Sequence, residues 1–392
     1  MDLTDHPAVT GLISPPPTVD AAPLRVMVFA QAYRPSIGGV ELLLAAVLDS
    51  LAEQGYQALV VTNATDACGS DRIGRVDVLR LPMAVAIERR DATLIAECLG
   101  AVAEAKRRFR PDLVHVAVTD PTGFFHLRTR RAHPSPTLTT LHVSVERLLG
   151  GPAPLLRELL DTSSRIGACS QSLLDEVTSA FPHLADSTVR CLSGALWPSR
   201  APTPPPDGPP RLLSLGRLVA DKGFDLLLRA MPSIQQRYPS TRLLLAGDGD
   251  ERPALEALAA AQGVADAVTF AGWAAPDTVP DLMAGSTAVI VPSRWKEAFG
   301  QVAAQAALMG RPVVATATGG LVEIVQHGIT GLLVEPESAP ALATAVDRLL
   351  ADPAAATRMG RVAHERAQRL YSLDATVSGY QALYGRAMGA AA

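Results

Sequence analysis

Aromatic side chains and cysteines are both scarce in this sequence of 392 residues, which contains 4% Phe, Trp and Tyr and four cysteines. The cysteines are far apart and show no metal-site spacing, so we expect them to be reduced thiols in the core. They are Cys68, Cys98, Cys169 and Cys191. No apolar run reaches the roughly 18 residues that a membrane-spanning helix needs. These absences argue against a disulfide scaffold, a zinc module and an integral membrane protein.

An excess of basic residues is also missing, since the net charge is −4. Residues 1–200 hold 19 Lys and Arg against 21 Asp and Glu, and residues 201–392 hold 16 against 18. Both halves are thus slightly acidic, whereas a nucleic-acid partner needs a concentrated basic surface. Local basic clusters at 106–110 and 128–133 are typical of solvated surface, and they leave peripheral membrane contact open.

The N-terminal residues 1–22 have acids where a signal peptide has bases, and prolines where it has an apolar run. We therefore expect a disordered leader and a cytoplasmic chain.

Short apolar runs alternate with longer amphipathic runs along the rest of the sequence. This alternation predicts parallel β-sheets with helical crossovers, that is, an α/β fold with doubly wound, Rossmann-like domains. The expected strands are 24–30, 58–63, 76–81, 111–117, 137–142, 164–170, 211–217, 241–247, 267–273, 287–293, 311–316 and 330–336.

A proline-rich stretch at 197–210 interrupts this alternation. Proline restricts the backbone and has no N–H group to donate to a helix or a strand. We interpret it as a linker between an N-terminal domain at 23–196 and a C-terminal domain at 211–370. The two domains would face each other across a cleft, with a helical tail at 371–392 that packs back on the first domain.

Ligands of such sheets bind outside the carboxyl ends of the strands, so we expect the binding residues in the loops that follow strands. Gly38 and Gly39 follow the first strand and can bring N–H groups close to a phosphate, although a plain tight turn is an alternative. Arg217 and Lys222 flank a later strand-to-helix loop. Two cations beside a helix N-terminus suit a diphosphate, whereas the alternative is two surface charges.

The stretch "VPSRWKEAFGQVAAQA" (291–306) places Glu297 directly before a predicted helix. A carboxylate can accept hydrogen bonds from sugar hydroxyls. The free N–H groups of Phe299 to Val302, a stretch that includes Gly300 and Gln301, can bind phosphate or sugar oxygens. A helix-capping role for Glu297 is the alternative. Gln305 lies two helical turns on and can line the same site or be a solvated side chain.

Two further features have weaker signals. Asp248 and Asp250 resemble a metal-binding pair, but acids that enter a helix are the better interpretation, and we expect no metal site. Trp273 could stack on a base or a sugar, and it could equally be a packing aromatic.

The order of these motifs resembles that of glycosyltransferase family 4, whose members are retaining, nucleotide-sugar-dependent enzymes of GT-B architecture. The resemblance extends from residue 24 over nearly the whole chain. It includes "GRLVADKGFDLLLRA" (216–230), "LLLAGDGDERPALEALAAAQG" (243–263) and "GRPVVATATGGLVEIV" (310–325).

The resemblance implies roles for single residues. Glu297 matches the first glutamate of a Glu-x7-Glu motif, which contacts the donor sugar, and Gln305 replaces the second glutamate, which binds the ribose. An amide still accepts a hydrogen bond there but loses the charge-assisted contact. Arg217 and Lys222 match the diphosphate-binding pair. His142 matches a histidine that points at the donor sugar, although the residues alone suggest a core or capping histidine.

The implied reaction transfers a sugar from a nucleoside diphosphate to an acceptor hydroxyl of a glycan, glycolipid or natural product, without a cofactor or metal. The base, the sugar and the acceptor are not specified by the sequence. The alternatives are a sugar-nucleotide 2-epimerase of the same architecture and a non-catalytic sugar-nucleotide-binding subunit.

Overall fold

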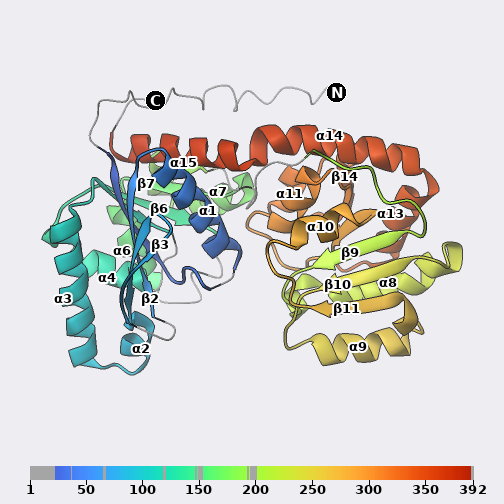
Figure 1. Cartoon of the computed structure of the whole chain (residues 1–392), viewed down its shortest axis with the longest axis horizontal. Coiled ribbons are helices and arrows are strands. Elements are labelled where there is room, and N and C mark those ends of the chain that lie inside the picture. The colour runs from blue at the N-terminus through green and yellow to red at the C-terminus, as the bar shows by residue number, and fades with distance from the viewer. Residues whose placement is uncertain are drawn as a thin grey trace. The chain divides into compact units, whose positions relative to one another are not determined.

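The computed structural model divides the chain into two compact units, of which the first is Met1–Leu196 with Leu373–Ala392 and the second is Trp197–Ser372 (Figure 1). The residues that the structure describes are 23–36, 38–64, 68–117, 121–145, 148, 153–191, 194 and 201–389. The expected leader at 1–22 and the first residues of the expected linker lie outside them.

The first unit is built on a sheet of eight strands in the order β3-β4-β2-β1-β5-β6-β7-β8. The strands are β1 (Arg25–Ala30), β2 (Gln57–Asn63), β3 (Gly69–Ile73), β4 (Val76–Leu81), β5 (Leu113–Val116), β6 (Thr137–Leu141), β7 (Arg165–Ala168) and β8 (Thr188–Arg190). Sequence patterns missed β3 and β8. β3 runs antiparallel to β4, and its polar, exposed side chains lack the apolar run of a buried strand.

Helices cover this sheet, and a core cluster around Phe29, Phe125 and Val102 fills the space beneath them. The helices are α1 (Gly39–Glu53), α2 (Met83–Glu88), α3 (Ala92–Phe109), α4 (Thr122–Thr129), α6 (Ala153–Thr162), α7 (Gln171–Ala180) and α15 (Leu373–Ala387), with 3-10 turns η1 (Arg130–Ala132) and η2 (Pro182–Ser187). The chain-terminal helix α15 packs on α1, β6 and β7.

The second unit has an all-parallel sheet in the order β11-β10-β9-β12-β13-β14. Its strands are β9 (Arg211–Leu215), β10 (Arg242–Ala246), β11 (Val268–Gly272), β12 (Ala288–Val291), β13 (Val313–Thr316) and β14 (Gly331–Val334). Its helices are α8 (Phe224–Arg237), α9 (Arg252–Ala261), α10 (Val279–Ala284), α11 (Gln301–Leu308), α12 (Leu321–Ile324), α13 (Ala339–Ala351) and α14 (Pro353–Tyr371), with 3-10 turns η3 (Ala220–Lys222) and η4 (Ala265–Ala267).

The strand order of the second unit reverses between β9 and β12, which makes their carboxyl ends the expected ligand crevice of a doubly wound sheet. Two glycines let the loops at this edge pack without side chains between them. A Cβ on Gly247 would lie 1.8 Å from the carbonyl oxygen of Gly216, and one on Gly223 would lie 2.1 Å from that of Pro292. The loops after β9, β10 and β12 are therefore locked together by backbone contact.

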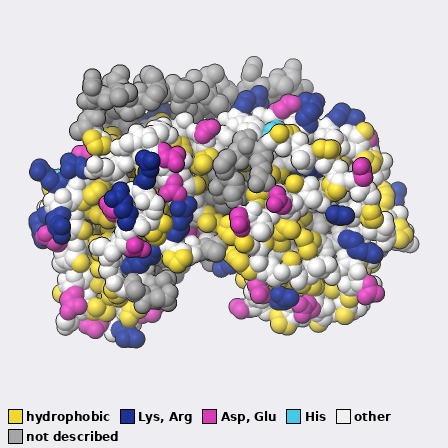
Figure 2. Space-filling model, in the orientation of Figure 1, with side chains coloured by type: hydrophobic (Ala, Val, Ile, Leu, Met, Phe, Trp, Pro, Cys, Tyr) yellow, Lys and Arg dark blue, Asp and Glu magenta, His cyan; other side chains and the backbone are white. Residues whose placement is uncertain are grey.

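Two expectations about single residues are wrong. Cys68 is exposed rather than part of the core, whereas Cys98, Cys169 and Cys191 are buried. Lys106, in the cluster at 106–110, is fully buried instead of solvated. Its neighbours Arg107, Arg108 and Arg110 are exposed and form a basic patch at the C-terminal end of α3 (Figure 2).

Among the described residues, no helix combines the length and apolar character that a bilayer crossing demands.

Candidate donor site at the carboxyl edge of the second sheet

Lys222 and Glu297 meet at the point where the strand order reverses. Lys222 ends the turn η3 after β9, and Glu297 lies in the loop after β12. The Lys222 Nζ donates a hydrogen bond to Glu297 Oε1 over 2.5 Å, and the two side chains are 29% and 16% exposed. The hydroxyl of Ser293 donates to the same carboxylate oxygen over 2.8 Å. A partly exposed cation and carboxylate are thus gathered over the buried hydroxyl of Ser293, and a polar ligand can reach the two charged groups.

Glu297 does not cap the helix that follows it. Helix α11 begins at Gln301 after Gly300, whose φ is 103° and which has no side chain to form a capping bond. The alternative of a capping acid is therefore wrong, because the carboxylate turns toward Lys222 instead. The helix starts at Gln301, two residues later than the N–H groups expected from Phe299 onward.

Arg294 binds the two loops of this site together. Its guanidinium donates to both carboxylate oxygens of Asp225, over 2.6 and 2.9 Å, and also to Glu337 over 2.9 Å. A further bond reaches the carbonyl of Ala220 in the turn that carries Lys222. The hydrogen bonds from Arg294 lower the pKa of the Asp225 carboxyl, and the same contacts raise the pKa of the guanidinium.

The paired glycines after β13 fix the backbone of the Glu297 loop from the other side. The N–H of Gly320 donates to the carbonyl of Glu297 over 2.7 Å. A Cβ on Gly319 would lie 2.3 Å from that carbonyl oxygen, and one on Gly320 would lie 2.3 Å from the carbonyl oxygen of Phe299. Only a residue without a side chain allows this approach.

Gln305 is 4% exposed, so the alternative of a solvated side chain is wrong. It lies on α11 among the buried alanines Ala303, Ala304, Ala306 and Ala307. Phe299 is also buried, and its ring packs edge-on against Tyr371 with centroids 5.6 Å apart. Its side chain therefore belongs to the core, and only its backbone can serve a ligand.

Arg217 and Trp273 are both exposed at the same edge of the sheet. Arg217 follows β9, and its side chain makes no hydrogen bond or ion pair with another described residue. Trp273 follows β11 and is 51% exposed, so it is not a packing aromatic. Asp248, after β10, accepts a hydrogen bond from the N–H of Gly249, as expected for an acid in a turn.

The remaining expected site residues belong to the first unit. His142 directly follows β6, and its Nε2 lies 3.0 Å from the hydroxyl of Thr140. Burial lowers its pKa to about 4, so the imidazole is neutral near pH 7. Gly38 precedes α1 in extended conformation, and the Glu41 carboxylate lies over it, because a Cβ on Gly38 would be 2.2 Å from that oxygen. Gly39 has open space around its α-carbon.

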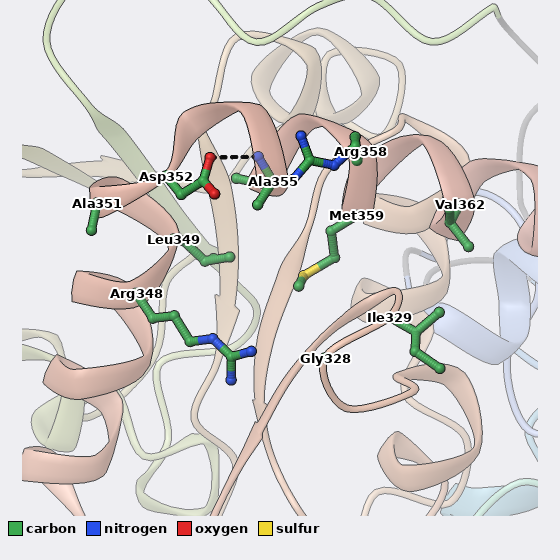
Figure 3. Close-up of a pocket in the computed structure, with 11 residues that line it drawn as sticks. Gly328, Ile329, Arg348, Leu349, Ala351, Asp352, Ala355, Arg358, Met359 and Val362 are labelled. Carbon is green, nitrogen blue, oxygen red and sulfur yellow. Dashed lines mark hydrogen bonds between the residues drawn. The ribbon is translucent and has the colours of Figure 1, made fainter.

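A hollow of about 480 Å³ opens on the opposite edge of the second sheet (Figure 3). Gly328 and Ile329, which precede β14, line it together with Arg348 on α13 and Met359 on α14. Because the strands are parallel, this hollow is remote from the carboxyl edge that carries Lys222 and Glu297. It is therefore not the donor site.

Ser293, Arg294 and Asp225 were not predicted as site residues. Ser293 is the last residue of the predicted strand at 287–293 and Arg294 follows it, so their position at a strand end could have identified them. The partner of Arg294 was not visible, because Asp225 lies 69 positions away in the sequence.

Two family models match consecutive parts of the chain. The model described as glycosyl transferases group 1 matches residues 197–366, and the model described as glycosyltransferase family 4 matches residues 37–190. The chain belongs to the group 1/family 4 glycosyltransferases.

One relative agrees with this membership. The glycogen synthase of Mycobacterium tuberculosis is 34% identical to this glycosyltransferase over 275 residues, which are 66% of this chain. The aligned part spans 65% of the length of that relative.

Solved structures show the fold. Sucrose-phosphate synthase from Thermosynechococcus elongatus superposes with a TM-score of 0.79 at 24% identity, over 94% of this chain and 100% of that one. Anabaena HepE, solved in complex with UDP and glucose, superposes with a TM-score of 0.73 at 22% identity, over 92% and 98%. The predicted GT-B class, with two doubly wound α/β domains, is confirmed.

Proposed function

We propose that this glycosyltransferase moves a sugar from a nucleoside diphosphate sugar to an acceptor hydroxyl, with retention of the anomeric configuration. The observation that carries the proposal is the contact between Lys222 and Glu297 at the carboxyl ends of β9 and β12. A diphosphate near Lys222 and a sugar near Glu297 would bring the two reacting parts of the donor to the two oppositely charged groups.

The bond between the anomeric carbon and the leaving phosphate oxygen breaks while the acceptor oxygen bonds to the same carbon. The acceptor proton passes to the leaving phosphate oxygen on the same face of the sugar. Negative charge grows on the diphosphate, and Lys222, the exposed Arg217 and the first N–H groups of α11 would stabilise it. This chemistry needs no bound metal, so we expect transfer to persist in the presence of a chelator.

The ion pair also indicates how the donor-free site is kept stable. Lys222 and Glu297 neutralise each other while no donor is present, since an unpaired charge at such partial burial is costly. The diphosphate would then draw the ammonium toward itself and leave the carboxylate to accept hydrogen bonds from the sugar.

Ligand screening would identify the nucleotide. A thermal-shift series with UDP-, GDP-, ADP- and TDP-sugars should single out one base, and HepE, a structural neighbour, was solved with UDP. The transferred sugar and the acceptor, whether glycan, glycolipid or natural product, would follow from assays with that donor.

The test of the site is Lys222→Ala. Loss of one such transition-state donor typically lowers kcat about 10²–10³-fold. The matched control is Arg237→Ala, which removes an exposed cation paired with Asp347 at the other end of α8. Near-native turnover of Lys222→Ala, with the control equally active, would refute the role of Lys222. Donor binding by the native protein without transfer to any acceptor would point instead to a binding subunit.

A further inference from the structure

A continuous line of hydrogen bonds runs through the first unit from the C-terminal helix to His142. The hydroxyl of Tyr384, on α15, lies 3.2 Å from His115 Nδ1. His115 Nε2 lies 2.9 Å from the Thr140 hydroxyl, which is 3.0 Å from His142 Nε2. The line therefore joins α15, β5 and the end of β6.

The interior of this line is closed to water. His115 and Thr140 are fully buried, and Tyr384 is 1% exposed. The ring of Tyr380 packs against His115 with centroids 5.7 Å apart. Burial lowers the pKa of His115 to about 3, and the phenol of Tyr384 has a raised pKa for the same reason. The imidazole of His115 and the phenol of Tyr384 are thus both uncharged near pH 7.

The directions follow from counting protons. A neutral imidazole has one N–H and one acceptor nitrogen, and a hydroxyl donates one proton. The Tyr384 hydroxyl has no partner other than His115 among the described residues, so it must donate to Nδ1 or leave its proton unpaired. His115 then carries its proton on Nε2 and donates to Thr140. The Tyr380 hydroxyl makes no hydrogen bond, so His142 Nε2 is the acceptor left among the described residues for the Thr140 proton, and Thr140 donates to it. The opposite direction would bury the phenol proton without an acceptor, which is energetically costly.

We propose that Tyr384 is a positioning residue that, through His115 and Thr140, holds His142 in the tautomer with its proton on Nδ1. His142 would then offer an N–H donor beyond β6 and would not act as a base through the engaged Nε2. This role rests on the proposed function, in which His142 serves the donor sugar. The tautomer itself does not depend on that function.

Long-range ¹H–¹⁵N correlation spectra of the full chain distinguish the two tautomers directly. We expect His142 as the Nδ1–H form and His115 as the Nε2–H form, with signals assigned from His142→Gln and His115→Gln. Tyr384→Phe should convert both signals to mixtures or to the opposite forms. The matched control is Tyr56→Phe, because Tyr56 lies near Gln381 on the same helix and is not part of the line.

A native His142 in the Nε2–H form would overturn the proposal. So would unchanged tautomers in Tyr384→Phe, or equal changes in Tyr56→Phe, since the latter would show a displaced helix rather than a broken line. If Tyr384→Phe fails to fold, the native spectrum still tests the predicted tautomers, and a native His142 in the Nε2–H form overturns the proposal.

Activity measurements connect the line to catalysis. Thr140→Val should lower kcat about five-fold, the equivalent of one hydrogen bond, with the donor KM within about two-fold. Thr140→Ser keeps the hydroxyl and should restore the rate. Unchanged kcat in Thr140→Val would overturn the link to His142. An inactive native protein would refute the proposed function and leave the spectra fully interpretable.

Discussion

Replacing Arg294 by methionine should loosen the site without touching Lys222 or Glu297. The guanidinium holds Asp225, at the start of α8, and Glu337, after β14, and it also reaches the turn that precedes α8. Methionine replaces the aliphatic part of the side chain but can form none of these bonds. We therefore expect a loss of stability together with a loss of turnover.

The magnitude follows from the bonds and their burial. Charge-assisted hydrogen bonds contribute about 1.5–3 kcal/mol each when they are buried. The Arg294 and Asp225 side chains are both 28% exposed, and Glu337 is 59% exposed, so the sum must be reduced for screening by solvent. We expect Arg294→Met to lower the free energy of unfolding by about 2–4 kcal/mol. A shift of Lys222 by about 1 Å would lower kcat up to about 10²-fold.

Urea unfolding and steady-state kinetics measure these two effects. Arg294→Lys keeps the charge but cannot form the two-pronged contact with Asp225, so it should recover only part of the loss. The control is Arg361→Met, whose partner Glu365 and own side chain are 54% and 61% exposed, and it should cost less than about 1 kcal/mol.

The pH dependence gives a second readout. Because Arg294 lowers the pKa of folded Asp225, this stabilisation is present above the unfolded pKa of about 4 and is lost as the pH falls through the folded value. The deficit of Arg294→Met should therefore shrink in acid. Equal stability losses in Arg294→Met and Arg361→Met would refute the reasoning.

Three further predictions concern single positions. Gln305→Glu should lower the donor KM if position 305 binds the ribose, while the buried carboxylate lowers the melting temperature without donor; an unchanged KM would remove the ribose contact. Gly320→Ala places a Cβ 2.3 Å from a backbone oxygen, so it should cost at least about 2 kcal/mol in unfolding assays, and a neutral result would contradict this packing. Burial lowers the pKa of Lys106 to about 7 from 10.5, so the native chain should gain stability over Lys106→Met as the pH rises from about 7 to 10, by up to about 1.4 kcal/mol per pH unit. Parallel melting curves across that range would contradict the buried charge.

The sequence by itself determined the class of fold, because buried parallel strands and amphipathic helices differ in the period and length of their apolar runs. All twelve expected strands are present. β3 was missed because its exposed residues carry no apolar pattern, and β8 because three residues are too few for a period. The residues Arg217, Lys222 and Glu297 were predicted as site residues because they follow strand ends, where a parallel sheet gathers its loops.

Tertiary structure decided which of these residues meet. Lys222 and Glu297 are 75 positions apart, and Tyr384 and His115 are 269 apart, so no local pattern could pair them. Tertiary structure also decided which polar side chains are buried. Gln305 and Lys106 lie in stretches whose sequence patterns are compatible with either an exposed or a buried position. Strand order and close backbone packing at Gly223, Gly247 and Gly320 bring distant loops together, and those contacts depend on the whole sheet rather than on any segment of the chain.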